Sequence, residues 1–155
     1  MAASTQDAKA VVKAYWDHGI KRAIKGEPGA LNEYLAPNFV VHTGALNRHG
    51  KGEADSHHDM ISETVKAIPD LGYKVHRLIA EGDTVVAQWR LYGKHSGHHK
   101  HKHHDEHIAP THDDLEVDGI TIYRVENGKI AESWSHDNHI DALVAAGAMQ
   151  VTPKG

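Results

Sequence analysis

The chain has no cysteine among its 155 residues, which excludes disulfides, thiolate nucleophiles and zinc sites built on cysteine. It has no apolar run near the roughly 20 residues that span a bilayer, and its polar first ten residues lack the apolar core of a signal peptide. We therefore expect a cytoplasmic protein with no membrane partner. Basic residues are not in excess, since the formal charge is −4 with histidine neutral, and this argues against a nucleic-acid partner.

Histidine is what the chain has in abundance, with 16 residues. Protonating all of them would add 16 charges and change the formal charge from −4 to +12, so the electrostatics should depend on pH below about 6.5. Hydrophobic residues make up 39% and charged residues 25%, as in an ordinary globular protein. The length suffices for one well-buried domain, so we expect residues 1–155 to form a single domain.

The apolar residues of the first third follow helical spacing. They predict a long amphipathic helix over residues 5–25, a short second helix from Pro28 through Leu35, and a third over residues 53–68. Residues 39–42 read as a short strand, and the following stretch to residue 52 as a loop. A final short helix is expected at residues 140–146.

The rest of the chain alternates like β-structure. Residues 73–80 and 84–95 form one predicted hairpin, and residues 115–125 and 129–137 form another. Helices followed by antiparallel hairpins indicate an α+β fold with the helices on one face of the sheet. A strongly curved sheet of this kind closes with its helices around a pocket.

Strand alternation separates the side chains into two faces. Val85, Ala87, Trp89 and Leu91 share the face that we expect to be interior. The last strand is ambiguous, because its tryptophan face also carries a glutamate while its other face is small and polar. Tyr15, Trp16, Trp89 and Trp134 serve either as core or as the lining of a cavity, and one residue can do both.

Two neighbouring residues near the end of the last strand, His136 and Asp137, are candidates for acid/base chemistry. A histidine titrates near neutrality, and burial can raise the pKa of an aspartate toward it. Adjacent strand residues point to opposite sides, so the two form a dyad only if the strand ends at Ser135. The alternative is that both cap the last helix or face water. His42 is either structural or part of a pocket, and His57 and His58 border the apolar stripe of the third helix.

Eight of the sixteen histidines lie between His95 and His112. In an extended strand, His99, His101 and His103 would project on one side, while in a helical turn His107 would converge with His103 or His104. Imidazole suits Zn, Ni and Cu. No single spacing is selected, however, and Lys100 and Lys102 repel a cation, so a solvated loop that binds metal loosely is the alternative to a metal site.

Several short motifs occur in order along the chain. They are residues 68–71 (IPDL), 79–86 (IAEGDTVV), 93–97 (GKHSG), 108–111 (IAPT), 117–120 (VDGI), 127–130 (NGKI) and 132–134 (ESW). With them the chain resembles the SnoaL-like polyketide cyclase (predicted ester cyclase) family over roughly residues 8–147. The resemblance implies the cone-shaped fold of the nuclear transport factor 2-like superfamily, in which a curved antiparallel sheet and three helices enclose a pocket, commonly in a homodimer.

The family's characterised cyclases close a ring by intramolecular aldol condensation, and they require neither metal nor organic cofactor. An acidic residue on the last long strand is their acid/base group. Counting from Asn127, that position is Ser135 here, and a second position that is acidic in many relatives is Asn138, next to Asp137. The histidine-rich stretch at about residues 98–107 exceeds the family's usual loop by about six residues.

We therefore predict a small-molecule lyase, isomerase or cyclase of SnoaL-like type. Asp137 or His136 would transfer the proton, with His42 and His95 as auxiliary polar groups. Tyr15, Trp16, Trp89, Trp134 and Ser135 would bind the small-molecule substrate. The alternative is a non-catalytic protein that binds a ligand, or binds metal through the histidine-rich loop.

Overall fold

The computed structural model of the chain describes residues 5–43, 53–97, 99–100, 107–108 and 110–155. The helices are α1 (Thr5–Ala14), η1 (Tyr15–Ile20), α2 (Lys21–Ile24), α3 (Glu53–Ala67) and α4 (His139–Ala145). The strands are β1 (Leu35–Thr43), β2 (Gly72–Glu81), β3 (Thr84–Lys94), β4 (His99–Lys100), β5 (His107–Ile108), β6 (Asp114–Glu126) and β7 (Lys129–Asp137). The predicted α+β class is confirmed.

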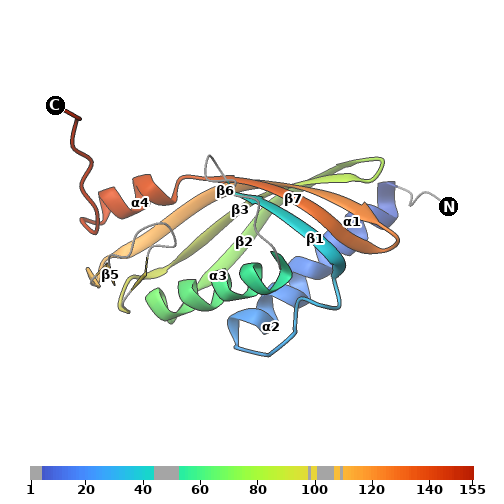
Figure 1. Ribbon diagram of the computed structural model, residues 1–155, viewed down its shortest axis with the longest axis horizontal. Helices are drawn as coiled ribbons and strands as arrows, with labels where there is room; N and C mark the ends of the chain where they lie inside the picture. Colours follow the sequence, from blue (N-terminus) through green and yellow to red (C-terminus); the bar gives the residue numbers. More distant parts are fainter. Residues whose placement is uncertain (1–4, 44–52, 98, 101–106, 109) are drawn as a thin grey trace.

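Five strands form one curved sheet in the order β1-β7-β6-β3-β2. All neighbours are antiparallel except β1 and β7, which run parallel. The helical run from α1 to α2 and helix α3 lie on one side of this sheet, and α4 lies at one end (Figure 1). We call the side that faces α1 and α3 the inner face, and the opposite side the outer face.

The predicted long first helix exists, but its centre is not α-helical. The helical run covers residues 5–24, and the six residues of η1 adopt the wider π-helical turn. Tyr15 and Trp16 begin this turn and are both buried. The Tyr73 hydroxyl donates a hydrogen bond of 2.6 Å to the Trp16 carbonyl oxygen, so a side chain of β2 holds the irregular turn in place. Such single turns are frequent at functional sites.

The predicted second helix, from Pro28 to Leu35, is wrong, because this segment forms successive turns. The amides of Asn32 and Tyr34 donate to carbonyls three residues earlier, and Gly29 has a φ of 68°, in the left-handed region. A left-handed residue interrupts the helical repeat, and only glycine adopts it freely. The strand expected at residues 39–42 is longer than predicted and begins at Leu35.

The remaining elements agree with the expectations. Helix α3, both predicted hairpins and the final helix occur within one or two residues of the predicted bounds. The β6–β7 turn places Asn127 and Gly128 at φ 51° and 75°, as the Asn-Gly sequence requires. Most of the loop expected between β1 and α3 lies outside the described residues. No helix in the described part of the chain is long and apolar enough to cross a bilayer.

The core lies between the inner face and the helices. Val85 and Ala87 have no exposed surface and Trp89 is 6% exposed, which confirms the predicted interior face of β3. A second, smaller cluster lies at the end of the sheet where α4 packs, and it consists of Ala67, Ile68, Leu115, Leu143 and Ala146. The sheet therefore presents its inner face to the main core.

Candidate active site

A chain of polar side chains crosses the inner face from β3 to β7. The Trp89 indole N–H donates to Thr121 Oγ1 at 2.9 Å, and Thr121 Oγ1 lies 2.9 Å from Ser135 Oγ. Thr121 on β6 is directly opposite Ser135 on β7, so strand register sets the spacing. Indole can only donate, and a hydroxyl both donates and accepts, so all three groups are satisfied in this order.

Gly119 makes this arrangement possible. It is opposite Trp89 in the β3–β6 register, and the indole ring lies over it. A Cβ atom at residue 119 would lie 2.2 Å from Trp89 Cζ2, which is inside any permitted contact. Without a side chain at this position, the indole can lie close to the sheet and reach Thr121.

A second polar contact joins helix α3 to the π-helical turn. The Tyr15 hydroxyl and His57 Nε2 are 2.6 Å apart, and the two rings stack with centroids 6.3 Å apart. Phe39 packs edge-on against the imidazole. Tyr15 is 2% exposed, and burial, helped by nearby Tyr123, raises the pKa of its phenol well above the ordinary value. The phenol is therefore protonated and can donate a hydrogen bond to the imidazole nitrogen.

Aromatic contacts connect the two polar groups. Tyr15 contacts Trp16 and Tyr123 with ring centroids 6.0 and 5.8 Å apart, and Trp16 contacts Trp89 at 6.1 Å. Burial raises the pKa of Tyr123 as well, so this phenol also stays neutral. No carboxylate, lysine or arginine is among the buried side chains of the described residues. The buried part of the inner face is thus aromatic, with neutral polar groups.

One buried donor here is not satisfied. The Trp16 indole N–H lies beside the Tyr123 hydroxyl, where it counters the effect of burial on the pKa of that phenol. No acceptor in the described part of the chain meets the N–H with normal hydrogen-bond geometry. A buried donor in this state costs about 1–3 kcal/mol, so it calls for an explanation.

Asp137 and His136 are separated by the strand. Because β7 extends through Asp137, the two side chains point to opposite faces. His136 is opposite Ile120 and is exposed on the outer face. Asp137 is opposite Gly119, in register with the inner face but at the strand end, where it accepts hydrogen bonds from the ring and the amide of His139. Since the strand does not end at Ser135, His136 and Asp137 form no dyad, and Asp137 is not a buried aspartate.

The Asp137–His139 contact is an ion pair. Partial burial pushes the pKa of Asp137 upward, but the hydrogen bonds from His139 outweigh burial and hold the pKa below its ordinary value. The same hydrogen bond raises the pKa of His139. Both groups are therefore charged over the pH range between their two pKa values. His139 follows Asp137 by two residues, so the contact is local.

His42 and Trp134 lie on the outer face. Their rings stack at 5.2 Å with an interplanar angle of 7°, and His42 Nε2 is 2.8 Å from a Glu132 carboxylate oxygen. The other carboxylate oxygen accepts a hydrogen bond of 3.2 Å from Arg124. The contact with His42 has the largest effect on the pKa of Glu132 and lowers it, and the hydrogen bond from Arg124 adds to this effect. Together they hold this pKa below its ordinary value although desolvation opposes them. Trp134 and Trp89 are on opposite faces, so they do not line one site.

His95 is fully buried just beyond the end of β3. Its Nδ1 accepts a hydrogen bond of 3.4 Å from the Thr111 amide, and the Thr111 hydroxyl lies at 3.3 Å. Burial, with a smaller effect of His112, lowers the pKa of His95. Its backbone bonds join it to Asp113 and His112. These partners place it at the base of the histidine-rich stretch.

The structure leaves the predicted metal site largely undescribed. His101, His103 and His104 lie outside the described residues. His99 and His107 belong to the short β4–β5 ribbon, where His99 is paired with Ile108 and His107 with Lys100, so the two histidines are not directly opposite. In the described ranges, no group of three or more potential metal-binding side chains converges.

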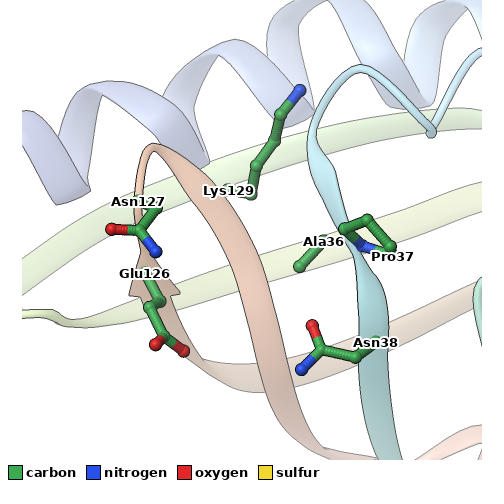
Figure 2. A pocket seen from close by; sticks show the side chains of 6 residues that line it. All are labelled: Ala36, Pro37, Asn38, Glu126, Asn127 and Lys129. Atoms are coloured by element: carbon green, nitrogen blue, oxygen red, sulfur yellow. The ribbon is translucent and has the colours of Figure 1, made fainter.

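A recess of about 220 Å³ opens where β1 begins beside the β6–β7 turn (Figure 2). It is lined by Ala36, Pro37, Asn38, Glu126, Asn127 and Lys129. None of the predicted catalytic, substrate-binding or metal-binding residues lines the recess. Lys129 donates to the Glu33 carbonyl oxygen, so the cation beside the recess already has a structural partner.

The sequence did not identify His57 as a site residue. Its place four residues before Ile61 marks only the border of an apolar stripe. What distinguishes it is Tyr15, which precedes it by 42 residues and contacts it only in the folded chain. Ser135 and Trp89, in contrast, are both predicted ligand-binding residues and belong to the same hydrogen-bonded chain.

Comparison with known proteins gives a consistent result. The family model described as SnoaL-like polyketide cyclase matches residues 16–145. No curated protein matches the chain. Many solved structures share the fold at low sequence identity.

Three of these structures illustrate the likeness. One, provisionally described as a SnoaL-like polyketide cyclase from Jannaschia sp. CCS1, is 19% identical with a TM-score of 0.77, covering 97% of this chain and 98% of that chain. AclR from Streptomyces galilaeus, provisionally described as a hydroxylase, is 21% identical with a TM-score of 0.72, covering 97% and 91%. IdmH from Streptomyces antibioticus, provisionally described as a polyketide cyclase, is 20% identical with a TM-score of 0.68, covering 90% and 98%. At these identities the likeness extends to the fold alone.

Proposed function

Because this chain belongs to the SnoaL-like polyketide cyclase family, we propose that it is a small-molecule lyase, isomerase or cyclase that transfers a proton at the inner face of its sheet. The observation that supports this most directly is the Tyr15–His57 pair, in which an imidazole nitrogen lies within hydrogen-bond distance of a buried phenol. The substrate would be a neutral compound, since the buried surroundings hold no charged partner among the described residues.

The proposed step is removal of a proton from a carbon next to a carbonyl. The carbon-bound proton passes to the Tyr15 oxygen as the phenol's own proton passes to His57 Nε2, which leaves an imidazolium and an enolate. Return of a proton at another atom completes an isomerisation, and attack of the enolate on a second carbonyl closes a ring. Coupled transfer avoids a free tyrosinate, which the raised pKa of Tyr15 disfavours.

Ser135 fits a binding role in this scheme. The family resemblance places the acidic proton-transfer residue at this position, and a serine hydroxyl is too weak a base to remove a carbon-bound proton. The hydroxyls of Thr121 and Ser135 would instead bind a polar group of the substrate. The base in this scheme is then His57, which is on helix α3 and not on the sheet.

Deuterium exchange into the methyl group of acetophenone, followed by proton NMR in heavy water, tests this proposal without the natural substrate. The wild type should accelerate exchange over buffer, and His57→Gln should reduce the acceleration at least about a hundredfold, as expected for loss of an acid/base group. His58→Gln is the matched control, because His58 is adjacent on α3 and its Nε2 lies 3.4 Å from the Glu27 carbonyl oxygen, away from Tyr15. Equal exchange by wild type and His57→Gln would contradict the proposal.

The Asp137–His139 pair is the second candidate for proton transfer, because Asp137 is in register with the inner face. Asp137→Asn and His136→Ala belong in the same exchange assay. We expect both to retain exchange. Loss of exchange in Asp137→Asn, with exchange retained in His57→Gln, would move the proton-transfer group to the end of β7.

We also propose that the outer face binds a second copy of the chain, as the family resemblance implies. Large apolar side chains are exposed there, and they are Val40, Ile79, Tyr92, Ile120 and Ile122. They share the face with both members of the Arg124–Glu132 ion pair, so the surface offers both charge signs to an identical partner. Light scattering should show a dimer, and Ile120→Asp should give a monomer. Val144→Asp is the control that should remain dimeric, because Val144 is exposed on α4 and not on the outer face.

The alternative proposal is that the histidine-rich stretch binds Zn, Ni or Cu. It rests on the clustering of eight histidines between His95 and His112. Calorimetry with each metal, on the wild type and on a form lacking residues 98–107, tests it. Stoichiometric micromolar binding that disappears with the deletion would support a metal site, and weak non-saturating uptake would reject it.

A further inference from the structure

Two buried tryptophans, Trp89 on the inner face of the sheet and Trp16 on the helical turn η1, differ in one respect. Trp16 and Trp89 are both 6% exposed, and their rings are in contact at 6.1 Å. The Trp89 N–H donates to Thr121 Oγ1. The Trp16 N–H lies beside the Tyr123 hydroxyl but, among the described residues, meets neither this oxygen nor another acceptor with normal hydrogen-bond geometry. Because indole can only donate, the group that would satisfy Trp16 must be an acceptor.

The position of Trp16 is fixed from two sides. Its backbone carbonyl accepts the hydrogen bond from Tyr73, and its ring contacts both Tyr15 and Trp89. The indole therefore stands beside the proposed proton-transfer pair at Tyr15 and beside the hydroxyl chain that begins at Trp89. A substrate that reached Tyr15 would meet this indole.

We propose that the Trp16 indole N–H binds the carbonyl oxygen of the substrate and the enolate oxygen that this carbonyl becomes, an assignment that rests on the function proposed above. Proton removal at the neighbouring carbon transfers negative charge to that oxygen. A donor held rigidly in apolar surroundings stabilises the charge more strongly than it binds the neutral carbonyl. The substrate class is thus a neutral ketone or ester with an acidic carbon–hydrogen bond next to the carbonyl.

The neighbours of Trp16 agree with a neutral acceptor. Tyr73 and Tyr123 are phenols whose pKa values burial raises, so neither carries a charge that would pair with an ionic ligand. An anionic ligand would have to leave water without a buried cation, since no lysine or arginine is buried in the described part of the chain. Negative charge that develops only during the reaction escapes that cost.

The test compares two probes that differ mainly in the carbonyl, acetophenone and ethylbenzene, titrated into nitrogen-15-labelled full-length protein. The chain has three tryptophans, so its indole N–H signals can be followed separately, and Trp134→Phe on the outer face helps to assign them. Acetophenone should move the Trp16 signal downfield in a saturable manner, and ethylbenzene should not. A shift confined to the Trp89 signal, or an equal shift with both probes, would overturn the assignment.

Trp16→Phe removes the N–H and keeps an aromatic ring. Its affinity for acetophenone should fall about fivefold to tenfold, as expected for one hydrogen bond, while its affinity for ethylbenzene stays within about twofold. Equal losses for both probes would show that Trp16 contributes shape alone. If the variant does not fold, the wild-type signals still decide the question.

The outcomes separate this assignment from the proposed reaction. A carbonyl-dependent shift of the Trp16 signal without deuterium exchange supports the binding role and rejects the proton transfer. If neither probe moves any indole signal at saturating concentration, the inner face does not admit small molecules, and both proposals fail.

Discussion

The two faces of the sheet use the same strands for different chemistry. On the inner face, Trp89 donates to the Thr121 hydroxyl, which in turn contacts the Ser135 hydroxyl, and no charge is involved. On the outer face, Trp134 stacks on His42, and His42 contacts the Glu132 carboxylate. Glu132 in turn forms an ion pair with Arg124. Alternate residues of a strand thus build a neutral network on one side and a charged one on the other.

Solvent access explains the difference. The Glu132 side chain is 25% exposed, so water stabilises its charge, whereas Thr121 is 4% exposed. A buried hydroxyl network contributes most by leaving no group unpaired, and loss of one member costs about 1–3 kcal/mol. An exposed ion pair contributes at most about 1 kcal/mol. Substitutions on the inner face should therefore destabilise the fold more than those on the outer face.

The largest effect is expected for Gly119→Ala. The added methyl group would overlap the Trp89 ring, and displacing the ring breaks its hydrogen bond to Thr121, so we expect a loss of about 2–4 kcal/mol in the free energy of unfolding. Urea unfolding measures it. The substitution should cost much less in a Trp89→Leu background, because the overlapping ring is gone. An undiminished cost there would disprove the steric explanation.

Thr121→Val comes next. Valine keeps the volume but leaves the buried Trp89 N–H without its acceptor, so unfolding should become easier by about 1–3 kcal/mol. Thr84→Val provides the control, since the Thr84 hydroxyl donates to the carboxylate of the adjacent Asp83 at an exposed contact, and it should change stability by less than about 0.5 kcal/mol. Equal effects of the two substitutions would mean that burial does not distinguish these hydroxyls.

Glu132→Gln should have a smaller effect, about 0.5–1 kcal/mol at pH 7. The pKa of Glu132 lies below its ordinary 4.5 in the folded chain, so its stabilising contribution is present above pH 4.5 and is lost as the pH falls through the lowered value. Chemical unfolding of wild type and variant should therefore differ at pH 7 and converge in acid. Glu126→Gln, at a more exposed partner of Arg124, is the control. A difference that grows in acid would contradict this account.

Asp137→Asn should change stability least, by about 0.5 kcal/mol or less. The lowered pKa of Asp137 gives a contribution that is lost as the pH falls below 3.8, and the raised pKa of His139 gives one that is lost as the pH rises beyond 6.5. The difference from wild type should therefore peak between about pH 4 and 6.5. Thermal melts across pH measure it, and a difference that increases steadily toward pH 9 would exclude the ion pair.

Much of the fold could be predicted from local sequence. The alternation of Val85, Ala87 and Trp89 identified the buried face of β3, and Asn127-Gly128 identified a hairpin turn. The helix predicted from Pro28 to Leu35 was wrong, because the apolar residues there have helical spacing but Gly29 adopts a left-handed backbone conformation. The spacing of apolar residues predicts which side chains are buried, but it does not predict the backbone dihedral angles of a single glycine.

The candidate site was less predictable. The face of β7 remained ambiguous because Trp134 and Ser135 offered equal reasons for pointing inward. The contact of Ser135 with Thr121 and that of Glu132 with His42 resolved it, and the second joins residues 90 positions apart in the chain. Long-range pairing is set by how the helices cover the sheet, which spacing alone does not specify. The π-helical turn likewise was not predicted, because the apolar spacing of residues 5–25 is that of a continuous helix.

The parallel pairing of β1 with β7 has a consequence for biogenesis. Its paired residues are 92 to 95 positions apart, so the first strand of the sheet finds its neighbour only after the last strand has left the ribosome. Until then a nascent chain carries an open strand edge that can pair with another nascent chain. Chaperones that cover this edge during synthesis should therefore raise the yield of folded protein.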